Sequence, residues 1–364
     1  MADSVSRQHN VETKPFDVAV IGDGIIGRSI ALELCRAGAS CVIIGNTHAG
    51  AGWRAAAGIL APSVGERDPD VRALFRRSLD LYPGFLDRLR TFDPGLSLVE
   101  GLLEVRSTPD VGTLGPDSIL LDESETQRQE PALLAPFGAV LHRRDAAADS
   151  ERIVAALERA LSAENLLVEI RDDAAASIEL DRSPPFVTTV SGQMLHAQSI
   201  VLAAGAWTPR LRGLPRPIPI SPLKGQIVAL DAPGVISRPV MAGHTYFVPR
   251  GRELVVGATQ EDVGFDTEAT DEAARSLQTD AARHCPALGN VPITRHWAGL
   301  RPATPDLLPI LGPEPLAPAL IYACGHSRTG ILLAPLTATL IRDCIAHPGA
   351  QDPALGRFSV TRFA

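Results

Sequence analysis

The chain of 364 residues lacks basic clusters, long apolar runs and any regular spacing of cysteines. Its net charge of −8 at pH 7, with no basic cluster, argues against a nucleic-acid partner. The longest apolar stretch, Gly330 to Ile341, is too short to span a bilayer, so no membrane partner is expected. Met1 to Pro15 is polar and has no apolar signal region. We expect a disordered tail at residues 1–15 and a cytoplasmic protein.

The five cysteines are odd in number and scattered, and none belongs to a C-x-x-C pair. They therefore predict neither a disulfide framework nor a zinc site, and they fit a reducing compartment. No other constellation of metal-ligating residues stands out, so no metal is predicted. With 45% apolar residues, a chain of this length can bury a large core, which favours two domains.

What the chain does contain is an apolar run, Val18 to Ile21, that is typical of a strand and leads directly into a glycine turn. A helical pattern follows the turn up to Gly38, and this context fits the G-x-G-x-x-G motif of dinucleotide-binding proteins. Gly22 allows the tight turn, Gly24 lets the backbone approach a pyrophosphate, and Gly27 lets helix and strand pack closely. The helix N-terminus offers N–H groups and a positive dipole end to the phosphates. The motif leaves NAD and FAD both open.

The next predicted strand, Ser40 to Ile44, ends without the acid that usually binds the ribose hydroxyls of a dinucleotide. Gly45 and Asn46 follow it instead, and Asn46 is the candidate for this contact through its side-chain amide. Further along, the small residues of Gly50 to Pro62 suit a chain that passes close to a flat ligand. A tightly packed helix start is the alternative interpretation of this run.

Periodicity predicts an alternation of helices and strands over the rest of the chain. Asp70 to Arg90 and Ser150 to Ala163 have helical spacing, with Ser150 as the expected cap, and polar Asp122 to Glu130 also favours a helix. Strands are expected at Leu98 to Val105, Leu166 to Ile170, Gln198 to Trp207 with a break at Gly205, and Ala319 to Cys324. The last of these strands leads into an apolar helix through about Ile345. Short alternating strands predict an antiparallel sheet in a second domain, at Lys224 to Leu230, Thr245 to Pro249 and Glu253 to Thr259.

Five motifs in this order resemble the FAD-dependent D-amino-acid oxidase superfamily, and most of all its glycine oxidase branch, which is associated with thiamin biosynthesis. They are the glycine turn, Ala55 to Pro62, Val201 to Trp207, Gly299 to Asp306 and Gly325 to Pro335. D-amino-acid dehydrogenases share the Gly-Leu-Arg-Pro-x-Thr-Pro-Asp motif, but their last motif lacks the arginine that stands here as Arg328. The resemblance covers nearly the whole chain after the tail.

The resemblance implies an α/β fold, α+β overall, in which a discontinuous FAD-binding Rossmann-like domain carries a second, mainly antiparallel substrate domain. We assign residues 16–85, 145–215 and 296–364 to the FAD-binding domain, and residues 86–144 and 216–295 to the substrate domain. FAD is expected to bind without a covalent bond, because Arg54 stands where some relatives have the linking histidine. The residues expected to bind FAD are Gly22, Gly24, Ile25, Ile26, Gly27, Asn46, Arg54, Ala55, Ala56, Ala57, Gly58, Ile59, Ala204, Gly205, Trp207, Arg301, His326, Ser327, Arg328, Thr329, Gly330 and Ile331.

The resemblance also implies the reaction and its partners. A hydride passes from the substrate Cα to flavin N5, oxygen is reduced to hydrogen peroxide, and the imine is hydrolysed to a 2-oxo acid. The substrate is expected to be glycine or another small amino acid or amine acid. The protein must hold the substrate carboxylate, and a guanidinium matches that group with two parallel hydrogen bonds.

Three residues match the substrate-binding positions of the family: Arg301, Tyr246 and Arg328. Arg301 is expected to bind the carboxylate, Tyr246 to assist it, and Arg328 to lie near the pocket. The residues alone leave open a salt bridge for Arg301, a core position for Tyr246 and a brace of the flavin loop for Arg328. His326 is expected to be structural, because hydride transfer needs no catalytic base, and Cys324 is expected to be a small core residue.

Two alternatives to the oxidase stay open. One is a D-amino-acid dehydrogenase that passes electrons to another acceptor, and the other is a flavin-binding protein without turnover. A specialised biosynthetic amine oxidase, in place of a thiamin-pathway enzyme, also fits the motifs. The sequence does not decide whether the protein forms a homo-oligomer.

Overall fold

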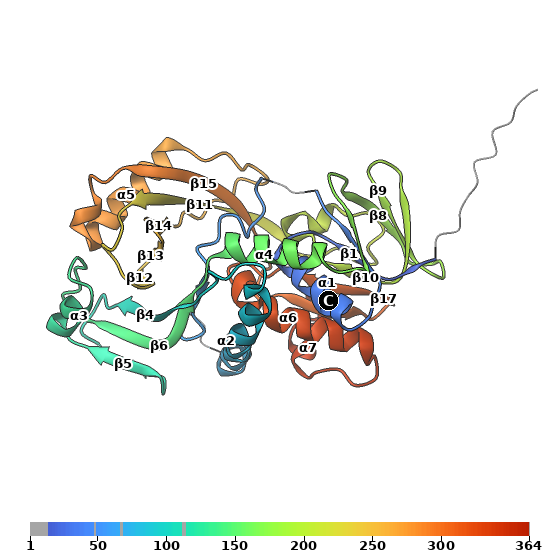
Figure 1. Ribbon diagram of the computed structural model, residues 1–364, viewed down its shortest axis with the longest axis horizontal. Coiled ribbons are helices and arrows are strands. Elements are labelled where there is room, and N and C mark those ends of the chain that lie inside the picture. The colour runs from blue at the N-terminus through green and yellow to red at the C-terminus, as the bar shows by residue number, and fades with distance from the viewer. Residues whose placement is uncertain (1–13, 47–48, 66–67, 111–113, 364) are drawn as a thin grey trace, which may run out of the picture.

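The computed structural model describes residues 14–46, 49–65, 68–110 and 114–363. Most of the expected tail, residues 1–13, lies outside the described residues. The described residues form two β-sheets that lie side by side, a mainly parallel one and a mainly antiparallel one (Figure 1). The predicted combination of a parallel and an antiparallel sheet is therefore confirmed. Among the described helices, none combines the length and apolar character that crossing a membrane requires.

The parallel sheet is built around the glycine-turn unit predicted from the sequence. β1 lies between β10 and β2, and β10 also pairs with β17 in parallel. β16 pairs with β17 in the antiparallel direction at one edge. In spatial order the strands are β16 (Ile310–Glu314), β17 (Ala317–Cys324), β10 (Met194–Leu202), β1 (Phe16–Ile21), β2 (Cys41–Ile44) and β7 (Leu167–Ile170), and the hairpin β8 (Ala175–Glu179) and β9 (Phe186–Thr189) extends from β10.

Helices cover one face of the parallel sheet. Val18 and Val20 of β1 pack against these helices, while Ala19 and Ile21 belong to the core on the opposite face. Because this parallel strand is buried on both faces, its successive residues Val18 to Ile21 are all apolar. The helices are α1 (Ile25–Arg36), α2 (Pro69–Arg90), α4 (Ser150–Ser162) and α6 (Gly330–Ala346).

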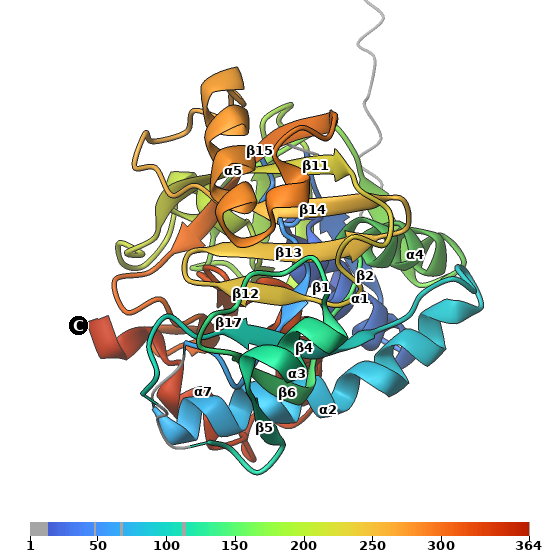
Figure 2. The same ribbon diagram turned by 90° about the vertical axis from the view of Figure 1, so that its left-hand side faces the viewer.

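The second sheet turns one face toward the parallel sheet and carries α5 (Asp271–His284) and α3 (Glu123–Gln129) on its outer side (Figures 1 and 2). All its strand pairs are antiparallel except β12 with β4. In spatial order its strands are β15 (Ile293–Ala303), β11 (Ser221–Asp231), β14 (Glu253–Gly257), β13 (Thr245–Arg250), β12 (Val240–Ala242), β4 (Val99–Val105), β6 (Ala139–Ala147) and β3 (Ile59–Leu60), and β5 (Ser118–Leu121) pairs with β6. The remaining short helices are η1 (Gly205–Arg210), η2 (Pro286–Leu288), α7 (Ala354–Arg357) and η3 (Val360–Phe363).

Two local expectations are corrected by the structure. The cap of α4 is Asp149, whose carboxylate accepts backbone hydrogen bonds from the first turn, so the prediction that Ser150 caps this helix was wrong. Ser150 is instead the first helical residue, and its hydroxyl donates to the carbonyl of Ala56 at 2.9 Å. The strand that was expected to break at Gly205 already ends at Leu202, and the short helix η1 begins at Gly205.

The predicted division into domains remains a prediction, and strand pairing suggests a refinement. β15 continues from residue 293 to residue 303, across the expected boundary at residue 296, and pairs with β11 of the antiparallel sheet along this length, apart from a register shift at Thr294. The short strand β3 also joins that sheet. We therefore propose that the last segment of the nucleotide-binding domain starts near residue 304.

Candidate functional site

A cavity of about 1100 Å³ is lined by residues of both sheets. On one side it meets the carboxyl ends of the parallel strands, at Ile21 of β1, Ile44 of β2 and Cys324 of β17. On the other side it meets β13 and β15 of the antiparallel sheet. Open α/β sheets bind ligands beyond the carboxyl ends of their strands, so this cavity lies where that rule predicts a ligand.

The three glycines of the turn have different surroundings, which separates their roles. Gly22 has a φ of +117°, and a Cβ there would lie 2.3 Å from the carbonyl oxygen of Ala203. A Cβ on Gly27 would lie 1.9 Å from the carbonyl oxygen of Gly22. Gly24 is different, because its nearest neighbour would be Cδ1 of Trp53 at an ordinary 3.5 Å. Gly22 and Gly27 are thus required by the fold itself, whereas Gly24 leaves space open on the cavity wall.

Two helices begin on the cavity wall. α1 starts after Gly24 and α6 starts at Gly330, and neither N-terminus has a side-chain cap among the described residues. The first N–H groups of a helix have no partner within the helix, and the helix dipole places partial positive charge there. An uncapped N-terminus therefore suits a phosphate group or another electron-rich ligand atom.

The small-residue run packs against β15 as well as lining the cavity. A Cβ on Gly52 would lie 2.9 Å from the carbonyl oxygen of Leu300, and a Cβ on Gly299 would lie 2.7 Å from Cβ of Ala55. Arg54 lies in this run but is not on the cavity wall, and its carbonyl accepts a hydrogen bond from the indole of Trp297 at 2.7 Å. Small residues are therefore needed here both for the contact between the sheets and for the cavity.

Arg301 lies on β15 with its guanidinium flat against Gly225 of β11, where an added Cβ would come within 2.3 Å of Nη2. Nη1 donates to the carbonyl oxygens of Thr259 at 3.2 Å and Lys224 at 3.4 Å. Among the described residues, no carboxylate lies within ion-pair distance of Arg301. Burial lowers its pKa, and the nearby charge of Arg328 acts in the same direction. Tyr246 and Glu261 oppose this shift in pKa, but neither outweighs burial. The cavity therefore holds a desolvated cation without a carboxylate at ion-pair distance among the described residues.

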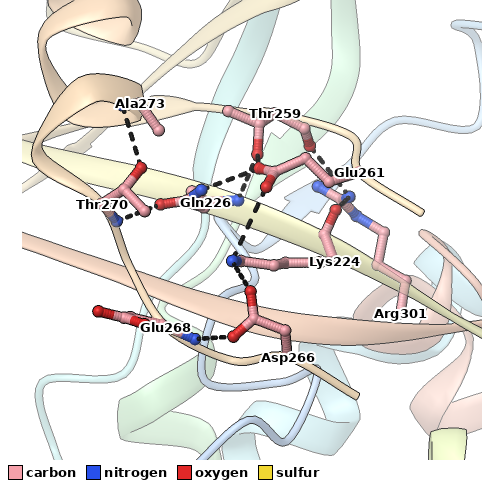
Figure 3. Close-up of polar contacts among 9 residues, drawn as sticks. All are labelled: Lys224, Gln226, Thr259, Glu261, Asp266, Glu268, Thr270, Ala273 and Arg301. Atoms are coloured by element: carbon pink, nitrogen blue, oxygen red, sulfur yellow. Dashed lines mark hydrogen bonds and ion pairs between the residues drawn. The ribbon is translucent and has the colours of Figure 1, made fainter. Parts of the chain in front are cut away.

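A polar network fixes the carbonyl groups beneath Arg301 (Figure 3). The buried ammonium of Lys224, with its side chain only 2% exposed, pairs with Asp266 at 2.6 Å. Glu261 accepts hydrogen bonds from the Gln226 amide and from the Thr259 hydroxyl. These contacts tie residues 259–266 to β11, so the loop and the strand together position the guanidinium.

Tyr246 and Arg328 lie near Arg301. The Tyr246 ring lies over Gly257 of β14, where an added Cβ would approach the hydroxyl oxygen to 2.3 Å. Burial raises the pKa of Tyr246 to about 12, against the opposing effect of nearby arginines, so the phenol stays protonated and can donate a hydrogen bond. Arg328 is exposed and donates to the side chain of Gln260. The three residues expected to bind substrate therefore converge on one cavity.

His326 and Ser327 form the turn that leads into α6. The imidazole of His326 is buried and lies 3.1 Å from the Thr337 hydroxyl, as expected for a structural histidine. Burial lowers its pKa to about 3. Ser327 has a φ of +47°, and its buried hydroxyl has no hydrogen-bond partner among the described residues.

The protein should lose stability in acid through His326. The folded state binds the His326 proton near pH 3, whereas an unfolded histidine binds it near pH 6.5, so stability falls as the pH drops below about 6.5. Between pH 8 and pH 5 this linkage amounts to about 2 kcal/mol of unfolding free energy. Denaturant unfolding of the wild type and of His326→Gln at both pH values measures it. A variant that loses as much stability in acid as the wild type would contradict the assignment.

Nearly all residues expected to bind a ligand lie on the wall of this cavity, the exceptions being Gly27 inside α1 and Arg54. Their assignment as ligand contacts remains a proposal. The cavity also includes residues that the sequence did not single out: Asp23, Met241, His244, Thr259 and Gln260. Asp23 had a signal in the sequence, because it lies inside the glycine motif. The others come from strands and loops of the second sheet that carry no motif of their own.

Together, the glycine turn, the uncapped helix N-termini and the large cavity define an α/β protein that binds a dinucleotide. Residues 17–344 match the family model described as DAO, FAD dependent oxidoreductase. The chain belongs to this family, and its cofactor is FAD. The residues present fit that group, because Gly24 leaves room for a pyrophosphate and the Ser327 hydroxyl offers an unsatisfied polar atom on the wall.

Relatives with assigned names agree with the family. The chain is 34% identical, over 95% of its length, to the bifunctional protein ThiO/ThiG of Nostoc sp. strain PCC 7120, and it covers 55% of that protein. It thus spans about half the length of such bifunctional relatives. It is 31% identical to a glycine oxidase of Pseudomonas aeruginosa, with 93% of this chain and 97% of the relative covered. The crystal structure of glycine oxidase from Geobacillus kaustophilus has a TM-score of 0.87 at 30% identity, covering 96% of this chain and 99% of that one.

Proposed function

We propose that this protein is an FAD-dependent oxidase of glycine or another small amino acid or amine acid. The observation that carries the proposal is the guanidinium of Arg301, a desolvated cation on the wall of the cavity without a carboxylate partner among the described residues. A buried cation is costly unless it is paired, so the site is suited to a ligand that brings its own anion. An amino-acid carboxylate is such a ligand.

Each side chain then has a defined task. Arg301 binds the substrate carboxylate through two parallel hydrogen bonds, and the protonated Tyr246 donates a further one. Arg328 adds positive charge at the more exposed part of the cavity. When bound, FAD supplies the acceptor for the two electrons of the Cα–H bond, and oxygen is the proposed final acceptor. The carbonyls of Lys224 and Thr259 hold the guanidinium still, so the Cα–H bond is presented in one orientation.

The name of the glycine oxidases among the relatives supports a small substrate. We propose the amino acid and oxygen as the partners, and we retain the cytoplasm as the location. The five cysteines, which are all buried and unpaired, are compatible with a reducing compartment. The assembly state is not part of this proposal.

A substrate screen tests the proposed function. Glycine, sarcosine, D-amino acids and cyclic imino acids are supplied to the purified holoenzyme, and hydrogen peroxide and oxygen consumption are measured. Equal amounts of oxygen consumed and peroxide formed support the oxidase. Bleaching of the flavin by substrate without oxygen, but no peroxide in air, indicates a dehydrogenase instead. Absence of bleaching with every substrate would leave only flavin binding.

Replacing Arg328 by alanine should have a moderate effect. Arg328 is exposed and hydrogen-bonded to Gln260, so its loss leaves no buried charge unpaired. A truncated polar contact of this kind costs about 1–2 kcal/mol, or roughly a tenfold change. We expect this change mainly in KM for the amino acid, measured by steady-state peroxide formation. Gln260→Ala is the matched control for the Arg328 position, and a large fall in kcat for Arg328→Ala would contradict the moderate role.

A further inference from the structure

We propose that Asp23, between the first two glycines of the turn, binds the ribose hydroxyls of the adenosine half of FAD. The chain lacks an acid at the end of β2, where dinucleotide-binding folds usually supply this contact. The inference rests on the assignment of this cavity to FAD. It does not depend on which amino acid is oxidised.

The carboxylate of Asp23 takes the space that a side chain at position 45 would need. A Cβ built on Gly45 would lie 2.4 Å from both Cβ and Cγ of Asp23, and 2.7 Å from its Oδ2. Gly45 directly follows β2, so it occupies the position at which the ribose-binding acid is expected. The acidic group is therefore present at the end of β2, but it is carried there by the glycine turn.

The surroundings of Asp23 suit an acceptor of hydroxyl groups. Asp23 lies on the cavity wall, and its side chain is 20% exposed, so its carboxylate can be reached from the cavity. Arg28 lies behind it at 3.9 Å and also pairs with Glu169 at 3.0 Å. This buried guanidinium and the N-terminus of α1 both place positive charge beside the Asp23 carboxylate. A carboxylate has two oxygens that accept hydrogen bonds, which matches the two neighbouring hydroxyls of a ribose.

Asn46 is the competing candidate. It also lies on the cavity wall, but it is exposed and follows Gly45, one residue beyond the expected position of the acid. Its side chain is a neutral amide, and hydrogen bonds to a charged group are stronger than hydrogen bonds between neutral groups. The structure therefore favours Asp23 as the main ribose contact and Asn46 as a secondary one.

Cofactor affinities test this inference. The full chain is first freed of flavin, and its affinities for FAD and for FMN, which lacks the adenosine half, are then compared. Dissociation constants are determined for the wild type, Asp23→Asn, Asp23→Gly, Asn46→Ala and the double variant Asp23→Gly/Gly45→Glu. We expect both Asp23 variants to bind FAD roughly tenfold to a hundredfold more weakly, with FMN affinity unchanged. The double variant returns the acid to the end of β2 and should recover most of the FAD affinity.

Glu169→Gln is the matched control, because it removes the other carboxylate that contacts Arg28 and leaves Asp23 in place. It should leave the ratio of FAD to FMN affinity unchanged. An Asp23→Asn protein with native unfolding behaviour and wild-type FAD affinity would overturn the inference. Tighter FAD binding would also overturn it, since the carboxylate would then face the pyrophosphate. A wild-type chain that binds FMN but no FAD would contradict the cofactor assignment itself.

Discussion

Replacing Arg301 by alanine is expected to lower kcat/KM for the amino-acid substrate by roughly two to four orders of magnitude while FAD remains bound. The reason is that the substrate carboxylate would enter a desolvated site without its cationic partner. Removing one member of a buried ion pair costs about 3–5 kcal/mol, and each 1.4 kcal/mol corresponds to about a factor of ten. FAD retention is expected because the substitution leaves the glycine turn and the other residues expected to bind FAD unchanged.

Steady-state peroxide formation, together with the flavin absorbance of each preparation, measures this effect. Arg301→Lys is the matched control, because it keeps the charge but loses the planar fork that binds a carboxylate through two hydrogen bonds. Its loss of activity should be smaller than that of Arg301→Ala. Near-wild-type turnover by Arg301→Ala would remove the carboxylate anchor from the proposed function. If Arg328→Ala were the more damaging substitution, the two roles should be exchanged.

Local sequence was sufficient for the nucleotide-binding half of the fold. The apolar strand β1, the glycine turn and α1 are contiguous in the sequence. Gly22 supplies the positive φ that the turn needs, and Gly27 leaves out the Cβ for which there is no room. The second sheet was predicted only in part. β6 contains two arginines and an aspartate within nine residues and pairs with β4, which is separated from it by more than thirty residues of chain. Such pairing depends on contacts distant in sequence, so periodicity alone does not reveal it.

In the candidate site, too, local motifs predicted some residues, whereas other features depend on residues that are far apart in the sequence. Arg301 was recognised by its motif, but the residues alone could not exclude a salt bridge. The answer depends on β11 and on the loop that follows β14, because the carbonyls of Lys224 and Thr259 accept hydrogen bonds from the guanidinium and no acid pairs with it among the described residues. The relation between Asp23 and Gly45 was also hidden, because it follows from how the glycine turn sits against the end of β2.

The second large effect is expected in FAD affinity, when a residue of the glycine turn is replaced. Gly24→Val should fold but bind FAD roughly a hundredfold more weakly, because the added methyl groups fill space that the pyrophosphate needs. The protein itself tolerates a side chain there. Gly24 has a φ of −73° and a ψ of −177°, which suit valine, and a Cβ would meet Trp53 only at 3.5 Å. Flavin absorbance and the dissociation constant for FAD measure the loss.

Gly27→Ala is the matched control for Gly24→Val, because it separates a clash with the protein from a clash with FAD. Its Cβ would lie 1.9 Å from the carbonyl oxygen of Gly22, so the clash is with the backbone of the protein and is present with or without FAD. Gly27→Ala should therefore lower the thermal unfolding midpoint of the FAD-free protein, whereas Gly24→Val should leave that midpoint nearly unchanged. If Gly24→Val instead unfolds the FAD-free protein, the space beside Gly24 serves packing. If it folds and keeps full FAD occupancy, the pyrophosphate does not lie beside Gly24, and the position of the cofactor in the cavity must be reassigned.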